Sequence, residues 1–289
     1  MRRFLISLLM LLLLISPVFA QAEYGCQVPE NLASPVARGI TNALGFNFLT
    51  KKAAKTAMIK VLKRNAEGDY DVKIDSFSAM DLKKGKFKSL EIEGKNISTH
   101  GVYVSSVVMN TICDYNYVDY WKRPVIFYTD LPLYFKAEIT EEDLNKTLVD
   151  LGYIKKLTDL NIAGVSLFTV DNVIFKMKNN KIYLIAQMKA PFLMGERVVK
   201  FTFSGKLNVE NGKIVLDNLQ SENLRNINLN AFVDIINSMN PFDLPLRIFR
   251  GADSTLSINN IKILDNKMYV DGIMVIKRSY NGQTKEETE

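Results

Sequence analysis

A strict alternation of apolar and polar side chains constrains this chain more than any other feature. It runs through residues 133–139 and again through 199–209, where every second position is apolar or glycine. A period of two is that of a β-strand with one buried face. The second stretch is long enough to indicate a large or strongly curved sheet, and we expect residues 72–277 to be β-rich.

Three similar stretches indicate that the strands are joined as hairpins. Residues 175–184, 207–216 and 261–270 each contain a strand pattern, a turn, a lysine and a second strand pattern. The turns contain residue types that tolerate the positive φ of a tight hairpin, namely Asn179-Asn180, Asn211-Gly212 and Asp265-Asn266. We therefore expect a largely antiparallel sheet of consecutive hairpins.

Helical spacing is found in three other stretches. Residues 32–67 are predicted to be helical, with a break near 45–47. The second part is amphipathic, because Ala54, Met58, Val61 and Leu62 recur every three or four residues. Thr140 followed by three acidic residues predicts a shorter helix over 140–151, and another is expected over 229–239, ended by Asn240-Pro241.

These elements predict a single α+β domain spanning residues 21–278. A long, strongly curved antiparallel sheet would wrap around the long amphipathic helix, with the two shorter helices beside it. Residues 279–289 are polar and are expected to form a disordered tail.

The first twenty residues have the three parts of a secretory signal peptide. Arg2 and Arg3 supply positive charge, residues 4–15 supply an apolar run, and Val18-Phe19-Ala20 supplies a cleavage site. A retained membrane anchor is the alternative, but the run is shorter than the roughly 20 residues of a spanning helix. We expect an exported protein, periplasmic or secreted, with at most peripheral membrane contact.

The charge of the mature chain argues against nucleic acid as a partner. The full chain carries a formal net charge of +6, of which two charges lie in the signal peptide. Lysines and arginines gather at 51–52, 60–64 and 83–88, but without the interleaved aromatic residues of a nucleic-acid surface. These patches form either a solvated face or a surface that weakly attracts anionic lipid headgroups.

Two cysteines, Cys26 and Cys113, remain after cleavage. They reach a compartment in which disulfides persist, so we predict that they are bridged. Two buried free thiols are the alternative. Lipidation of Cys26 is not expected, because residues 23–25 lack the leucine and small residues of a lipoprotein signal.

Residues that enzymes commonly use are scarce. His100 is the single histidine and lies in a predicted turn before a strand at Val102. The chain has no Gly-x-Ser-x-Gly motif, phosphate-binding glycine loop or dinucleotide motif. One histidine and two separated cysteines do not form a structural zinc site. We predict no catalytic residue, metal or cofactor, while noting that two carboxylates can converge from distant parts of a chain.

Methionine and phenylalanine are abundant on the predicted inward faces of the strands. Methionine is flexible and polarisable, which suits an apolar cavity of irregular shape. Ordinary core packing is the alternative for each residue taken singly. The set predicted to line a lipid cavity consists of Phe175, Met177, Leu184, Met188, Phe201, Phe203, Met268, Val270 and Met274.

An apolar trio is predicted at the tip of a hairpin. Phe192, Leu193 and Met194 lie between two strand patterns and are flanked by Lys189 and Arg197. The loop either enters the boundary of a membrane, with the cations near headgroups, or folds back over the mouth of the sheet. We predict the membrane contact.

Several motifs, taken in order, resemble the LmeA-like phospholipid-binding family. They are the segment 72–97, the helix start at 139–148, the proline-containing segment 240–246, and 258–275 with its Asp-Asn-Lys turn. The resemblance implies a fold similar to the tubular lipid-binding superfamily, export, and phospholipid binding, and it supplies no catalytic residues. The chain departs from the family at its two cysteines and at residues 114–132.

Taken together, these features favour an exported lipid-binding or lipid-transfer protein of the cell envelope. It would act as a monomer on a phospholipid or another acyl lipid, with affinity from burial of about 0.8 kcal/mol per CH₂. Two other classes stay open. One is an enzyme that processes envelope glycans or glycolipids, and the other is a non-catalytic structural component of the envelope.

We predict that the mature protein begins at Gln21, because Val18 and Ala20 occupy the positions that signal peptidase reads. Mass spectrometry of the exported protein should give the mass of the chain without its first twenty residues. An exported protein that retains Met1 would contradict this.

Overall fold

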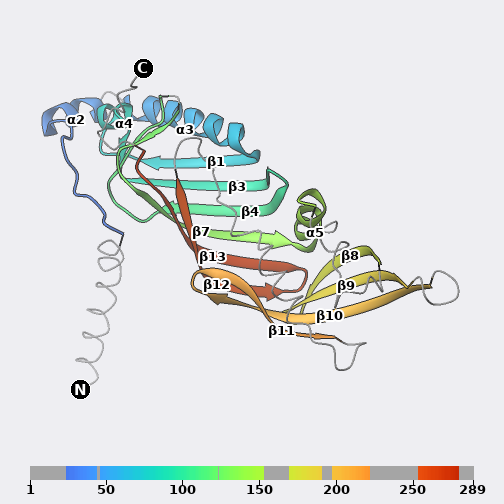
Figure 1. Cartoon of the computed structure of the whole chain (residues 1–289). Coiled ribbons are helices and arrows are strands. Elements are labelled where there is room, and N and C mark those ends of the chain that lie inside the picture. The colour runs from blue at the N-terminus through green and yellow to red at the C-terminus, as the bar shows by residue number, and fades with distance from the viewer. Residues whose placement is uncertain are drawn as a thin grey trace, which may run out of the picture.

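The computed structural model of the protein describes residues 24–43, 46–122, 124–152, 169–190, 197–221 and 253–279. Within these residues β-strands dominate, and they form three antiparallel sheets (Figure 1). Four of the sequence predictions lie outside the described residues: the signal peptide, the helix over 229–239, the apolar trio at 192–194, and all but the first residue of the tail.

The largest sheet has six strands, and its order departs from the order of the sequence. Its C-terminal hairpin adds to β7 rather than to the strand that precedes it in the chain. The order is β1 (Glu67–Asp75), β3 (Ser89–Thr99), β4 (Val102–Thr111), β7 (Leu131–Thr140), β13 (Lys267–Ile276) and β12 (Ser254–Leu264).

The second and third sheets are smaller. The second consists of consecutive hairpins and has the order β11 (Lys213–Ser221), β10 (Arg197–Glu210), β9 (Lys181–Ala190) and β8 (Thr169–Lys178). The third consists of the short strands β2 (Lys86–Phe87), β5 (Asn116–Asp119) and β6 (Ile126–Phe127).

The predicted hairpin turns are confirmed. Asn179, Asn180, Asn211 and Asn266 have φ values of 53°, 57°, 51° and 61°, and Gly212 has a φ of 73°. Asparagine tolerates this left-handed region better than most residues, which is why these pairs can close two-residue turns.

The described helices are α2 (Pro35–Ala43), α3 (Phe46–Asn65), α4 (Ala79–Lys83) and α5 (Glu141–Asp150). The helix predicted from Thr140 is confirmed, and it begins with a capping box. The Thr140 hydroxyl accepts a hydrogen bond from the Asp143 amide, and the Asp143 carboxylate accepts one from the Thr140 amide. The short helix α4 was not predicted. The Ser78 hydroxyl caps it by accepting a hydrogen bond from the Asp81 amide.

The predicted fold class is wrong in its central feature. The structure has several antiparallel sheets rather than one long curved sheet, and no described helix is wrapped by a sheet. The longest described helix, α3, lies alongside β1, at the margin of the main sheet (Figure 1).

The physical reason lies in how α3 distributes its apolar side chains. Ala54, Met58 and Leu62 are spaced four residues apart and form a narrow buried stripe, as predicted. Phe46, Phe48 and Leu49 in the first turn are exposed instead. A helix with one narrow buried stripe needs a sheet on one side only, so it caps the edge of the core and does not fill its centre.

A single apolar core connects the two larger sheets. It contains the buried stripe of α3, the inward faces of β3, β7 and β13, and the inward faces of β8, β9 and β10. Polar contacts reinforce the junction. Asn145 of α5 donates to the carbonyl of Phe175 (2.9 Å) and accepts from its amide (2.7 Å), and the Ile258 amide donates to the Gly212 carbonyl (2.8 Å).

Ion pairs fix α3 along β1. Lys51 lies 3.0 Å from the carboxylate of Asp75, and Lys55 pairs with Asp71. The hydrogen bond and charge of Lys55 lower the pKa of the Asp71 carboxyl. Burial acts to raise the pKa of the Asp75 carboxyl, but the hydrogen bond and charge of Lys51, together with the Ser76 amide and the charge of Lys88, lower it overall.

A carboxyl whose pKa is lower in the folded state stabilises the fold above its unfolded pKa, near 4, and loses this effect as pH falls through its folded value. The unfolding free energy of the wild type should therefore decline as pH falls below about 4. In the double variant Asp71→Asn, Asp75→Asn this decline should be smaller. Urea unfolding between neutral and acidic pH measures this. Asp253→Asn, which removes an exposed carboxylate outside the ion pairs of the described residues, should leave the acid dependence unchanged.

Candidate functional site

The residues predicted to line a lipid cavity are mostly buried in the core. Eight of the nine have described side chains, and each is at most 6% exposed and belongs to the single apolar cluster. The ninth, Met188, lies in β9, and its side chain is outside the description. Their burial is established, whereas their contact with lipid stays a prediction.

A cavity of about 690 Å³ lies between the C-terminal half of α3 and the described residues of the segment 120–125, namely 120–122 and 124–125. It combines an apolar floor with cationic side chains. It is lined by Ala57, Lys60, Val61, Arg64, Asn65, Tyr120, Trp121, Lys122, Pro124 and Val125.

Three of the described residues that line this cavity are cations. Lys60 and Arg64 are one helical turn apart on α3, and Lys122 faces them from the loop between β5 and β6. No aspartate or glutamate is among the lining residues that the structure describes. In the described part of the chain, none of the three cations forms an ion pair. The cavity is therefore a positively charged recess with an apolar floor.

A buried tyrosine fixes the loop wall of the cavity. The Tyr120 hydroxyl donates to the carbonyl of Leu82 in α4 at 2.7 Å, and burial raises the pKa of this hydroxyl well above its usual value. It therefore stays a neutral donor at any physiological pH. The ring of Tyr120 also contacts that of Trp121, with centroids 5.0 Å apart. Trp121 is the single tryptophan of the chain and is 46% exposed.

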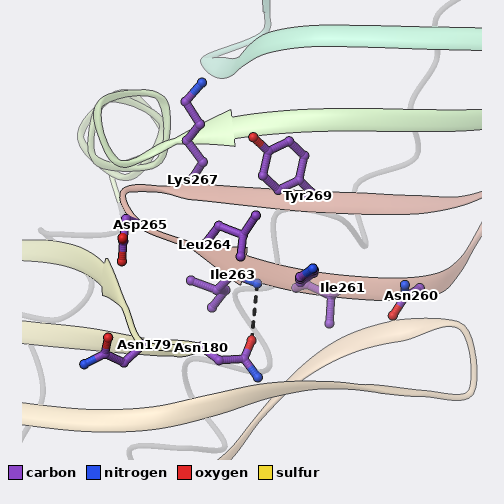
Figure 2. Close-up of a pocket in the computed structure, with 10 residues that line it drawn as sticks. Asn179, Asn180, Asn260, Ile261, Ile263, Leu264, Asp265, Lys267 and Tyr269 are labelled. Atoms are coloured by element: carbon purple, nitrogen blue, oxygen red, sulfur yellow. Dashed lines mark hydrogen bonds between the residues drawn. The ribbon is translucent and has the colours of Figure 1, made fainter.

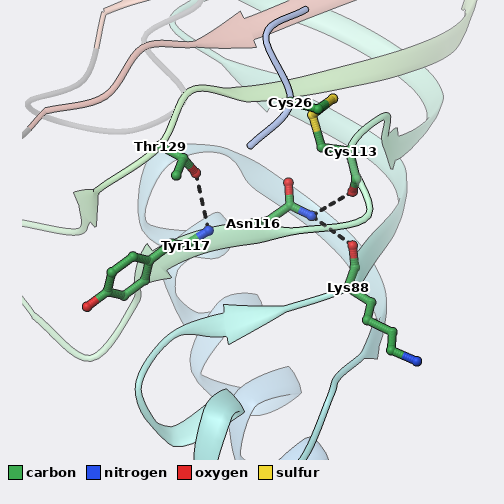
Figure 3. Close-up of a disulfide and its surroundings, with 6 residues drawn as sticks. All are labelled: Cys26, Lys88, Cys113, Asn116, Tyr117 and Thr129. Carbon is green, nitrogen blue, oxygen red and sulfur yellow. Dashed lines mark hydrogen bonds between the residues drawn. A yellow bond between two sulfur atoms is a disulfide. The ribbon is translucent and has the colours of Figure 1, made fainter. Parts of the chain in front are cut away.

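The predicted disulfide is confirmed, because Cys26 and Cys113 are bonded (Figure 3). Beside it, the Asn116 side-chain amide donates to the carbonyls of Cys113 and Lys88, at 2.8 Å each. These contacts tie the N-terminal segment to the chain that leads into β5. The bridge is consistent with an oxidising compartment and hence with export.

Two further contacts anchor the segment before α2. The ammonium group of Lys86 donates to the carbonyls of Glu30 (2.9 Å) and Asn31 (3.2 Å). The Ala33 amide donates to the buried carboxylate of Asp81 at 2.7 Å. The start of α2 is therefore fixed against α4 and β2.

A second cavity of similar volume lies where the two larger sheets meet (Figure 2). Asn179 and Asn180 face the β12–β13 hairpin there, and the Asn180 side chain accepts a hydrogen bond from the Ile263 amide at 3.3 Å. Lys267 pairs with Glu138 at 2.6 Å. This recess is bounded by turns that hold each other in place and by a neutralised lysine, so it is a structural junction.

The described residues offer little for metal or acid–base chemistry. No group of three or more His, Cys, Asp or Glu side chains in this part of the chain could hold a metal ion. His100 lies in the predicted turn before β4, with a φ of 48°, and its ring contacts the Thr99 hydroxyl at 3.0 Å. Among the described helices, none has the length and apolar character that crossing a bilayer requires.

The sequence did not predict the cavity between α3 and residues 120–125, but it did indicate part of the positive charge around it. The sequence indicates a basic cluster at 60–64, either solvated or weakly attracting anionic headgroups, and a departure from the resembling family at 114–132. The chain's only tryptophan, next to a lysine inside that segment, is the signal that could have connected the two. What no pattern showed is that α4 and β5 bring residues 120–125 against α3.

Comparison of the chain with protein-family models, curated proteins and solved structures gives no match.

We predict that Tyr120→Phe lowers the unfolding free energy by about 0.5–1.5 kcal/mol, because it removes the hydrogen bond to the Leu82 carbonyl. Tyr117→Phe is the matched control. Its ring is stacked on that of Tyr128, and its hydroxyl bonds no group within the described residues. Chemical denaturation of both variants measures the difference. Equal losses would mean that the Tyr120 hydroxyl does not hold the loop.

Proposed function

We propose that this protein is an exported lipid-binding protein of the cell envelope that holds an acyl lipid with an anionic headgroup. The observation that carries the proposal is the cavity between α3 and residues 120–125, which has an apolar floor and three cations without acidic partners. A lipid-transfer role is a finer form of the same proposal. Phospholipid is the lipid class that the resemblance to the LmeA-like family favours.

The size and lining of the cavity suit such a ligand. Its volume of about 690 Å³ falls within the roughly 300–1,000 Å³ of small-molecule sites, which are mostly apolar with a few placed polar groups. Ala57, Val61 and Val125 offer apolar surface to an acyl chain, and each buried CH₂ contributes about 0.8 kcal/mol.

The cations suit the headgroup. A guanidinium such as that of Arg64 can donate two parallel hydrogen bonds to a phosphate, while Lys60 and Lys122 act as mobile point charges. A cation without an acidic partner in a partly enclosed recess loses little when it binds an anion, because no ion pair has to be broken first. A neutral lipid would forgo this attraction.

The lining also bears on the competing classes. An enzyme that uses paired carboxylates needs two acids near its substrate, and the described lining of this cavity contains none. A purely structural component has no requirement for three cations around an apolar recess. We therefore favour lipid binding over catalysis or a structural role. In this proposal the residues first predicted to line a lipid cavity, such as Phe175 and Met177, pack in the apolar core instead.

The single tryptophan allows a direct test. Trp121 lines the cavity, so a phospholipid with a brominated acyl chain should quench its fluorescence in a saturable manner. Phosphatidylglycerol should bind more tightly than phosphatidylcholine with the same chains. Absence of saturable quenching by either lipid would contradict the proposal.

A volume-adding variant sharpens this test. Ala57→Phe fills part of the cavity and should weaken lipid binding by at least about fivefold, because a filled site resists added volume at about 1–3 kcal/mol. The control is Ala53→Phe, the same change one helical turn earlier on α3, where the residue is exposed and not in the lining. Equal quenching in the wild type and both variants would place the lipid elsewhere.

A further inference from the structure

We propose that α2 and the first turn of α3 form a surface that docks onto an anionic phospholipid bilayer. We call this surface the apolar patch, and it consists of Val36, Ile40, Phe46, Phe48 and Leu49. It is distinct from the predicted contact at 192–194 and does not depend on whether the cavity binds lipid.

The apolar patch is too exposed to be part of the core. Val36 and Phe48 are each 72% exposed, and Leu49 is 62% exposed. Single exposed apolar residues are common on proteins, but a contiguous cluster of large ones marks an interaction site. Within one short stretch of chain, five such side chains face outward.

The helix α2 exposes its apolar residues and partly buries its polar ones, which is the reverse of an ordinary surface helix. Its apolar residues Val36 and Ile40, one turn apart, point outward. Its polar residues Arg38 and Thr41 are half-buried, and the Arg38 guanidinium donates to the Ala33 carbonyl at 2.7 Å. An amphipathic helix with its apolar face outward is stable only if that face meets something other than water.

The charges on α3 indicate what kind of partner contacts the apolar patch. Helix α3 carries six lysines and arginines and no acidic residue. Lys51 and Lys55 are paired with β1, whereas Lys52, Lys60 and Lys63 are exposed and form no ion pair within the described ranges. Apolar side chains beside a row of cations match the acyl boundary and the headgroups of an anionic bilayer. A second copy of this chain would place like charges against each other.

The patch is also presented rigidly. In Figure 1, α2 and α3 lie at the margin of the molecule beyond β1, with α2 at one end. The chain just before α2 is held by the disulfide at Cys26 and by the hydrogen bond from Ala33 to Asp81. A surface that is fixed before binding loses little conformational entropy when it meets a membrane.

Flotation with vesicles tests the proposal. The mature protein should float with vesicles of phosphatidylglycerol mixed with phosphatidylcholine, and much less with phosphatidylcholine alone.

Phe48→Ser with Leu49→Ser should weaken binding to the mixed vesicles by at least about tenfold, through loss of buried apolar area. Lys52→Gln with Lys63→Gln should weaken it by about fivefold for each cation removed. Val149→Ser with Leu264→Ser, which changes two exposed apolar residues on α5 and β12, is the matched control and should bind normally.

Three outcomes would overturn the proposal. The first is unchanged vesicle binding in the Phe48, Leu49 variant. The second is a sharply lower melting temperature in that variant, which would mean that another segment of the chain covers the patch. The third is a wild-type dimer, seen by light scattering, that the variant dissociates.

Cavity binding and membrane docking can fail separately. The Phe48, Leu49 variant should still show quenching of Trp121 by a short-chain brominated phospholipid supplied below its micelle concentration. Ala57→Phe should show lipid quenching weakened by at least about fivefold and still float with vesicles.

Discussion

The hydrogen bonds of β13 determine how the rest of the molecule is arranged. Val270 pairs with Ala137 of β7 on one side and with Ile261 of β12 on the other, so this late strand joins segments from both halves of the chain. The turn before it has a similar role, because Asn266 accepts from the Glu141 amide and donates to the Met177 carbonyl, at 3.1 Å each. One residue therefore links the main sheet, α5 and the second sheet. Gly272 is required in β13, since a Cβ there would lie 2.2 Å from a carbonyl of β12.

With the sheets fixed in this way, α3 contributes residues to both the cavity and the apolar patch, from opposite ends of the helix. The buried stripe of α3 packs on the core, and its ion pairs with β1 set its direction. Its first turn then faces outward, and Lys60 and Arg64 near its other end face residues 120–125. The disulfide, which in the chain-entropy model contributes about 4 kcal/mol, holds the N-terminal segment to the same side.

Local structure could be predicted from the sequence where apolar residues recur with a clear period or where a turn needs a special backbone conformation. The strand patterns, the asparagine turns and the helix start at Thr140 were predicted because each depends on a few neighbouring residues. The arrangement of strands into three sheets was not predictable, since β13 meets β7 across more than a hundred residues and no local pattern encodes that pairing. The prediction that the sheet wraps around α3 was wrong. The spacing of apolar residues identifies which face of α3 is buried, but it does not show how much of the helix the sheet covers. The cavity was missed for the same reason, as its two walls lie far apart in sequence.

The placement of β13 also sets the order in which the chain can fold. The main sheet lacks its two strands at one end, β13 and β12, until the last described hairpin has joined β7, and a late, long-range pairing of this kind is slow to form. The edge of β7 that pairs with β13 therefore stays uncovered until this hairpin has been synthesised. An unpaired strand edge can pair with another chain, so β7 is exposed to such association until the β12–β13 hairpin covers it.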